Sequence, residues 1–265
     1  MSCPKCVEGY ELPGEPVGSI QADFLGAYFT PGSVSGDKRA VVLLTDAFGL
    51  PLKNCKIIAD RIAKDVGCDV WVPDYFAGRP IIPLDAMNMP DKAEQRATVL
   101  DWIKFVFNGI PAIPGFIRNR ASVVDARLES FFALLKEKET YEKIGAVGYC
   151  FGGATAIRLA STDSVNTVVI AHPAPFKMDQ VRAIKVPCAW VCPEVDIFLG
   201  SEVRNNAEAE LARKKEAGNG IEYEFHDYPG TQHGFACRPN NKYPELVEQY
   251  EKALEDTIGW FKKTL

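Results

Sequence analysis

The sequence predicts an α/β fold with a mostly parallel, twisted sheet and helices on both of its faces. Two observations carry this prediction. Short apolar segments alternate with longer amphipathic ones, and the short segments are continuous apolar runs. Strands that are buried on both faces have this continuous apolar character, and their alternation with helices is typical of parallel sheets. A chain of 265 residues, 47% of them hydrophobic, can form one large core without disulfides.

The expected elements follow one another in this alternation. Residues 39–45 (RAVVLLT) are a continuous apolar run, which predicts a strand buried on both faces. Ile58, Ile62 and Val66 recur at helical spacing, which predicts a helix over 52–66. The other expected strands are 20–29, 69–72, 143–148, 166–171, 186–191 and 221–227, and the other expected helices are 91–108, 117–138, 152–161, 203–217 and 243–263.

The chain is expected to form a single domain over residues 1–265. It contains no internal repeat, low-complexity block or linker. Residues 1–18 are rich in glycine and proline and lack periodicity, so we interpret them as an N-terminal arm. The proline-rich stretch 73–90 is interpreted as loops over the edge of the sheet rather than as a domain boundary.

The formal net charge of −5 disfavours two classes of partner. An acidic chain gains nothing from releasing the counterions of nucleic acid, and no basic stretch is long enough to dock on anionic lipid. There is no run of 18 apolar residues and no apolar segment in residues 1–20, so neither a membrane span nor a secretory signal is expected. We therefore expect a cytoplasmic protein whose eight cysteines are reduced. The sequence leaves its oligomeric state open, a homodimer included.

The segment GYCFGG at residues 148–153 carries the most specific functional signal. It lies between a predicted strand and a predicted helix, as the G-x-S-x-G nucleophile turn does, with cysteine in place of serine. Such a sharp turn crowds neighbouring Cβ atoms, which accounts for Gly148 and Gly152. Cys150 is then expected at the N-terminus of the next helix, where partial positive charge favours a thiolate. The alternative is a buried thiol in a glycine-rich turn.

Three histidines are available as the base for such a nucleophile: His172, His226 and His233. In folds with this turn, the chain order is nucleophile, acid, histidine. His233 lies in the loop GTQHGFA, between the last expected strand and the last expected helix, and is therefore the expected base. His172, at the end of strand 166–171, is expected at the rim of the pocket. His226 lies within a strand pattern and is expected to be structural.

The acid that orients this base is expected after strand 186–191, where Glu194 and Asp196 are the candidates. Asp196 is favoured because a reverse turn there would point its short side chain back at the histidine. It would then hold His233 in the useful tautomer and stabilise the imidazolium form. The alternative is that both acids are solvated surface groups.

The turn GYCFGG, the downstream aspartate and the sequence HGFA around His233 together resemble the dienelactone hydrolase family. The N-terminal arm and the acidic overall character are most similar to its fungal members. The resemblance runs from residue 16 to the C-terminus. It implies an α/β-hydrolase fold and a carboxylic ester hydrolase with the triad Cys150, His233 and Asp196. The substrate would be a small ester or lactone, such as an enol lactone, which is cleaved through a thioester acyl-enzyme.

The resemblance also implies roles for the turn Asp46-Ala47-Phe48-Gly49. Asp46 stands where the bacterial members have glutamate, and would accept the Cys150 proton when substrate arrives. The backbone N–H groups of Ala47 and Phe151 would form the oxyanion hole, with each such donor worth roughly 3–4 kcal/mol. The alternative for Asp46 is a carboxylate that caps the following turn.

The candidate substrate contacts come from several segments. Bacterial members hold the substrate carboxylate with an arginine just after the histidine. Here Cys237 stands four residues after His233 and Arg238 stands five after it. Arg79, near the predicted mouth, is a second candidate for this role. Tyr149 and His172 are further candidate contacts, and loops 74–90 and 109–118 are expected to line the pocket.

Other features of the sequence bear on alternative functions. Cys3 and Cys6 form a CxxC pair, but no second pair supplies the four ligands of a structural zinc site. No nucleotide-binding motif is present, so no cofactor and no metal are expected. A non-catalytic, redox-sensing member that uses a reactive Cys150 is one alternative. A thioesterase or general carboxylesterase is another.

Overall fold

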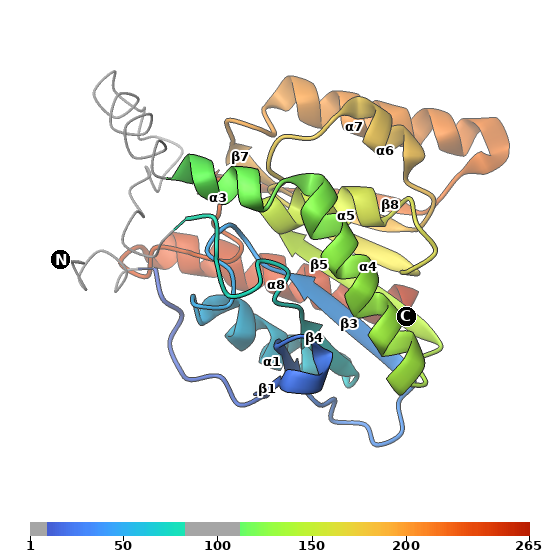
Figure 1. Ribbon diagram of the computed structural model, residues 1–265. Coiled ribbons are helices and arrows are strands. Elements are labelled where there is room, and N and C mark those ends of the chain that lie inside the picture. The colour runs from blue at the N-terminus through green and yellow to red at the C-terminus, as the bar shows by residue number, and fades with distance from the viewer. Residues whose placement is uncertain (1–9, 83–111) are drawn as a thin grey trace.

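The computed structural model describes residues 10–82 and 112–265, which form an eight-stranded sheet flanked by helices (Figure 1). The strand order is β1-β2-β4-β3-β5-β6-β7-β8. The strands are β1 (Ser19–Gln21), β2 (Ala27–Thr30), β3 (Arg39–Leu44), β4 (Asp69–Val72), β5 (Lys143–Tyr149), β6 (Thr167–Ala171), β7 (Cys188–Val195) and β8 (Tyr223–Gln232). The pairs β1–β2 and β2–β4 are antiparallel, and the other pairs are parallel. The predicted fold class is confirmed.

The central strands account for the continuous apolar runs of the sequence. Every residue of β6 is buried, as are the last five residues of β3. Side chains alternate between the two faces of a strand, so a strand covered on both faces is apolar throughout. Strands β3, β5, β6 and β7 run parallel, and Leu44 at the end of β3 pairs with Gly148 near the end of β5. Their carboxyl ends therefore meet at one edge of the sheet, where ligands bind in such folds.

Helices cover both faces of this sheet (Figure 1). On one face, α1 (Asn54–Val66) and α8 (Pro244–Thr264) enclose a core cluster that includes Ile58, Ile62 and Phe261. The other face is covered by α4 (Ala121–Lys138), α5 (Phe151–Leu159), α6 (Met178–Ala183) and α7 (Ser201–Lys214). Each large apolar side chain buried in these layers contributes about 1.5–3 kcal/mol to stability.

The described part of the expected N-terminal arm, residues 10–18, lies along α1. The backbone N–H of Leu12 donates to Asn54 Oδ1 at 3.1 Å, and that of Val17 donates to Asp60 Oδ2 at 2.8 Å. The Asn54 Nδ2 donates in turn to the carbonyl oxygens of Tyr10 and Cys237, at 2.7 and 2.9 Å. Asn54 therefore ties this segment to the loop that follows β8.

The expected strand at 20–29 is wrong as a single element. The chain forms β1, a 3-10 turn over Ala22–Phe24, and then β2, which pairs back onto β1. Leu25 and Gly26 adopt positive φ angles of 57° and 76°, which reverse the chain direction. Gly26 makes this conformation accessible, and the alternating pattern alone did not reveal it.

The expected helix at 117–138 is also wrong as one element, since it is divided into α3 (Ile113–Arg118) and α4. Asn119 at the break is fully buried: its Nδ2 donates to the Arg79 carbonyl at 3.1 Å, and its Oδ1 accepts from Arg127 at 2.8 Å. These bonds attach loop 73–82 to the helices. Helix α6 was not predicted, and the expected helix at 91–108 lies outside the described residues. Within residues 10–82 and 112–265, no helix combines the length and apolar character that crossing a membrane requires.

Candidate active site

The turn between β5 and α5 has the strained geometry expected of a nucleophile elbow. Cys150 is the single residue between the two elements, and its φ and ψ angles are 54° and −111°. A positive φ is unfavourable for a residue with a Cβ, at a cost of order 1–3 kcal/mol. The backbone N–H of Cys150 donates to the Ala171 carbonyl at 3.1 Å, and the Cys150 carbonyl accepts from Ala174 at 2.8 Å. Its side chain is half-buried, unlike the other described cysteines, which are buried.

Two glycines make this turn sterically accessible, as the sequence predicts. A Cβ on Gly148 would lie 2.0 Å from the Gly152 carbonyl oxygen. A Cβ on Gly152 would lie 2.1 Å from the Leu44 carbonyl oxygen. Because both obstacles are backbone atoms, no side-chain movement can relieve the overlap. The close approach of β5, α5 and the end of β3 therefore requires glycine at both positions.

A Gly148→Ala substitution should lower the free energy of unfolding by about 1–3 kcal/mol, the usual range for overpacking. Gly259 in α8 provides the matched control, because it is exposed and a Cβ there has no atom within 4 Å. Gly259→Ala should instead raise stability by about 0.5–1 kcal/mol through helix propensity. Urea denaturation of both variants measures the difference. Equal effects at the two positions would contradict the role assigned to Gly148.

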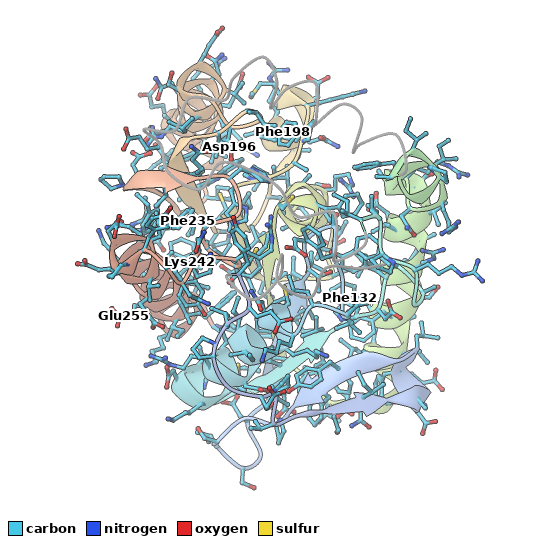
Figure 2. All side chains as sticks on the ribbon, turned by 90° about the vertical axis from the view of Figure 1, so that its left-hand side faces the viewer. Phe132, Asp196, Phe198, Phe235, Lys242 and Glu255 are labelled. Carbon is cyan, nitrogen blue, oxygen red and sulfur yellow. The ribbon has the colours of Figure 1, made fainter. Side chains whose placement is uncertain are left out.

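The candidate acid and base stand side by side because their strands are paired. Val195 ends β7 and Gln232 ends β8, and these two residues are register partners. Asp196 and His233 follow them directly, and His233 Nδ1 lies 2.8 Å from Asp196 Oδ2. The other carboxylate oxygen, Oδ1, accepts from the N–H groups of Phe198 and Leu199 at 2.7 and 3.1 Å. Figure 2 shows Asp196 and Phe198 near one another, with Phe235 below them.

The competing acid, Glu194, is engaged elsewhere. It is exposed, and its Oε2 accepts from the Gly230 backbone N–H at 2.7 Å. The structure therefore brings Asp196, and not Glu194, to the histidine.

The electrostatic state of His233 reflects both of its neighbours. Burial lowers the pKa of this imidazole, but the Cys150 sulfur and the Asp196 carboxylate outweigh burial and raise it to about 10. A shift in this direction favours the imidazolium form, which is stabilised by negative charge on both sides. The Cys150 sulfur is thus one of the groups whose charge acts on His233.

His172 does not lie at an exposed rim, which corrects the sequence-based expectation. Its side chain is fully buried, and its ring centroid is 5.1 Å from that of His233, with the planes at 61°. Burial, followed by the nearby charges of His233 and Arg238, holds the His172 pKa well below its usual value. The imidazole is therefore neutral, and it packs edge-on against the ring of His233.

Asp46 and Arg238 form a buried ion pair beside this group. Arg238 Nε donates to Asp46 Oδ2 at 2.7 Å, and the two side chains are 11% and 1% exposed. The Cys237 thiol donates to the same oxygen at 3.6 Å, and the Phe48 N–H donates to Oδ1 at 3.1 Å. No hydrogen bond joins Asp46 to Cys150 in the part of the chain that the structure describes. Because it accepts from the Phe48 N–H, Asp46 also caps its own turn. Turn capping was the alternative role expected for this residue.

The two expected oxyanion-hole residues occupy defined backbone positions. Phe151 is the first residue of α5, so its N–H has no acceptor within the helix. The Ala47 carbonyl accepts from the N–H groups of Ile81 and Ile82 at 3.0 and 3.1 Å, which fixes the orientation of this turn. The role of both N–H groups stays a prediction.

The remaining candidates lie apart from this group or below it. Arg79 is exposed in the loop after β4. Tyr149 is 2% exposed in the core, with its ring 6.0 Å from that of His172, and its contact with substrate stays a prediction.

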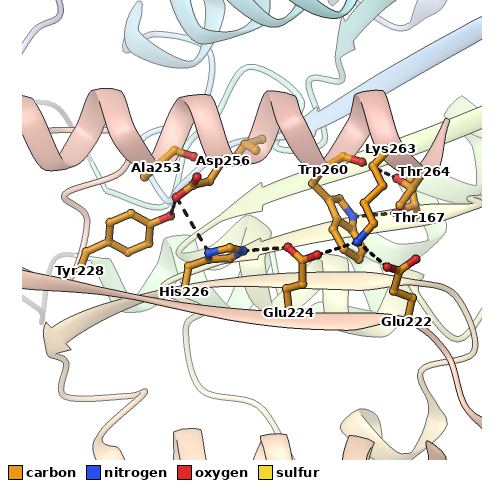
Figure 3. Close-up of polar contacts among 11 residues, drawn as sticks. Thr167, Glu222, Glu224, His226, Tyr228, Ala253, Asp256, Trp260, Lys263 and Thr264 are labelled. Carbon is orange, nitrogen blue, oxygen red and sulfur yellow. Dashed lines mark hydrogen bonds and ion pairs between the residues drawn. The ribbon is translucent and has the colours of Figure 1, made fainter.

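His226 lies on β8 against α8, where its Nε2 is 3.0 Å from Glu224 Oε2 (Figure 3). On the same strand, the Tyr228 hydroxyl donates to the neighbouring Asp256. Figure 3 thus places His226 in a charged network between β8 and α8.

Sequence reasoning missed two neighbours of the site. Phe198 stacks edge-on against His233 with a centroid distance of 5.4 Å, and Cys237 contacts Asp46. Both contacts depend on loop conformations after β7 and β8, and the only sequence signal was their closeness to Asp196 and His233. Within the described residues, no group of three or more His, Cys, Asp or Glu side chains is placed to hold a metal.

Comparisons with known proteins agree with this architecture. The model of the dienelactone hydrolase family matches residues 24–265. The hydrolase tropI from Talaromyces stipitatus is 26% identical over 97% of this chain and 94% of its own length. A human carboxymethylenebutenolidase homolog is 26% identical over 98% of this chain and 96% of its own.

A solved structure has the same fold. The crystal structure of a dienelactone hydrolase from Anabaena variabilis superposes with a TM-score of 0.56 over 90% of this chain and 91% of its own, at 14% identity. The family match spans most of the chain and includes the elbow, Asp196 and His233. The chain therefore belongs to the dienelactone hydrolase family of ester hydrolases.

Proposed function

We propose that this protein hydrolyses a small activated ester or lactone, such as an enol lactone, with Cys150 as nucleophile, His233 as base and Asp196 as the acid that orients it. The observation that carries the proposal is geometric: Cys150 stands half-buried at a strained turn on the edge of the sheet where His233 Nδ1 lies 2.8 Å from Asp196 Oδ2. The raised pKa of His233, which the Cys150 sulfur and Asp196 both favour, agrees with this arrangement. An imidazolium beside a thiolate is the ground state of an activated cysteine nucleophile.

The chemistry proceeds in two stages. The Cys150 sulfur attacks the ester carbonyl, and the N–H groups of Phe151 and Ala47 stabilise the oxyanion. The alkoxide or enolate leaves with the proton of the His233 imidazolium, so His233 becomes neutral, and the acyl group remains on Cys150 as a thioester. His233, oriented by Asp196, then accepts a proton from water as the water attacks the thioester. A thiolate leaves more readily than an alkoxide, so cysteine suits substrates with good leaving groups and does not suit peptide bonds.

The Asp46–Arg238 ion pair connects the binding of an acidic substrate to the removal of the proton from Cys150. In the structure, Arg238 is neutralised by Asp46. A substrate carboxylate can replace Asp46 as the partner of Arg238, which frees Asp46 to accept the proton of any Cys150 that is in the thiol form. The proposed substrate class is therefore a lactone or ester that bears a carboxylate.

A substrate panel tests this proposal. An acidic enol lactone should exceed its neutral methyl ester in kcat/KM by about 10–100-fold, the usual effect of a hydrogen bond to a charged group. Arg238→Met should abolish the preference, whereas Arg79→Met, at the exposed second candidate, should keep it. If Arg79→Met alone removes the preference, Arg79 is the carboxylate-binding residue. If acyl thioesters or unactivated alkyl esters are the best substrates, the thioesterase or general carboxylesterase alternative replaces this proposal.

The redox-sensing alternative has a different signature. It predicts fast alkylation of Cys150 by iodoacetamide together with no turnover of any ester in the panel.

A further inference from the structure

Unpaired polar atoms concentrate at one place beside the candidate base. Among the described residues, five buried side-chain polar atoms have no hydrogen-bond partner. Three of the five are Nδ1 and Nε2 of His172 and Nε2 of His233, in two rings whose centroids are 5.1 Å apart. Buried polar atoms are nearly always paired with protein or with ordered water. This cluster therefore marks a position for a small polar molecule beside the nitrogens of the two imidazoles.

The backbone holds His172 in this position under strain. His172 has a φ angle of 32°, which is unfavourable for a residue with a Cβ. Its N–H donates to the Val191 carbonyl of β7 at 2.9 Å, which anchors the residue at the end of β6. Its ring packs among aromatic rings, with centroid distances of 6.0 Å to both Tyr149 and Phe235. Neither contact satisfies its nitrogen atoms.

The chemical state of His172 limits what it can do. Burial and the positive charges of His233 and Arg238 keep its pKa well below the usual value, so the ring is neutral. A neutral imidazole carries one donor and one acceptor nitrogen. It can therefore orient a water molecule, but it cannot compete with His233 for the proton of that water.

We propose that His172 is a positioning residue that holds the hydrolytic water of deacylation against His233 Nε2. This inference rests on the proposed function. The water oxygen bonds to the thioester carbonyl carbon while His233 Nε2 accepts one of the water protons. The C–S bond then breaks, and Cys150 leaves as a thiolate beside the protonated His233, which restores the starting ion pair. Thioester, water and neutral His233 become carboxylic acid, thiolate and imidazolium, and His172 neither gains nor loses a proton.

The charge change on acylation supports a role in this second step. The Cys150 sulfur is one of the groups that favour the protonated form of His233. Once the sulfur carries the acyl group, it no longer bears negative charge, so the neutral form of His233 becomes more accessible. His233 Nε2 is then able to accept a proton, and His172 lies beside it to fix the water that supplies one.

The test uses His172→Phe, which keeps a planar ring of similar size and removes both nitrogens. With p-nitrophenyl acetate, nitrophenol release from the first turnover should keep its wild-type rate. Hydrolysis of the acyl-enzyme should slow by about 10–100-fold, the effect of losing a hydrogen bond that aligns a reacting group. Acylated protein should accumulate at steady state, measured by intact mass after an acid quench. Added hydroxylamine, an acyl acceptor that is not held by His172, should capture more of the acyl group in the variant.

Two further variants separate positioning from packing. His172→Gln retains polar atoms and should restore part of the deacylation rate. Phe198→Leu removes another ring that contacts His233, at 5.4 Å, without removing a nitrogen. It should change acylation and deacylation by the same factor.

Three results would overturn the inference. The first is that the His172→Phe acyl-enzyme is hydrolysed at the wild-type rate, and the second is that acylation and deacylation slow by the same factor. The third is that KM alone rises, as expected if His172 only contacts the substrate. If ester hydrolysis by the wild-type protein does not require Cys150, the proposed function fails as well. If it does require Cys150, any of the three results removes only the role of His172.

Discussion

Cys150→Ala should reduce kcat for aryl ester hydrolysis by about 10³–10⁶-fold, the range seen when the nucleophile of a catalytic triad is removed. The side chain is half-buried at the strained turn, and no other described cysteine is exposed to substrate. The N–H groups of Phe151 and Ala47 and the imidazole of His233 would remain in place but would have no sulfur to act on. Steady-state release of nitrophenol measures the loss.

Cys188→Ala is the matched control for the removal of a thiol. Cys188 begins β7, is fully buried in the core and lies at the opposite end of that strand from Asp196. This variant should lose stability through a small cavity and should keep its turnover rate. A Cys150→Ala protein that retains wild-type activity while folded would show that Cys150 is not the nucleophile.

Asp196→Asn should lower both activity and the pKa of His233. The Asp196 carboxylate raises this pKa through its charge and through its hydrogen bond, so the value should fall from about 10 when the carboxylate becomes an amide. At alkaline pH, a smaller fraction of His233 should then be in the imidazolium form than in the wild type. The kcat should fall by about 10²–10⁴-fold, as expected when the base loses the group that fixes its tautomer.

NMR titration can follow this change directly, because the chain has only three histidines. Glu224→Gln is the matched control, since it makes the same change at the carboxylate that lies 3.0 Å from His226 on β8. It should leave the His233 titration and the turnover unchanged. If Asp196→Asn leaves the His233 midpoint unmoved, then Asp196 does not govern the base.

Much of the site was predictable because it depends on local chemistry. Gly148 and Gly152 flank Cys150 because a turn this tight excludes Cβ atoms, and that requirement is visible in the sequence alone. His233 and Asp196 were predictable because each follows the end of a parallel strand, and adjacent strands end at one edge. The continuous apolar runs of β3 and β6 likewise identified the buried strands.

The rest depends on contacts between residues far apart in the chain. The pairing of Asp46 with Arg238 spans 192 positions, and no local pattern announces it. The division of helix 117–138 depends on the buried bonds of Asn119 to loop 73–82, which propensity does not encode. His172 was expected at a rim because it ends a strand, but its positive φ and its packing against His233 place it in the interior.

The central claim is that the sulfur of Cys150 carries the acyl group during turnover. Rapid mixing with an aryl ester, an acid quench and peptide mapping by mass spectrometry test it most directly. We predict that the acyl mass is found on the peptide that contains Cys150, and that it is lost on further incubation in water. Turnover with no acyl mass at Cys150, or with the acyl group on another side chain, would contradict the account.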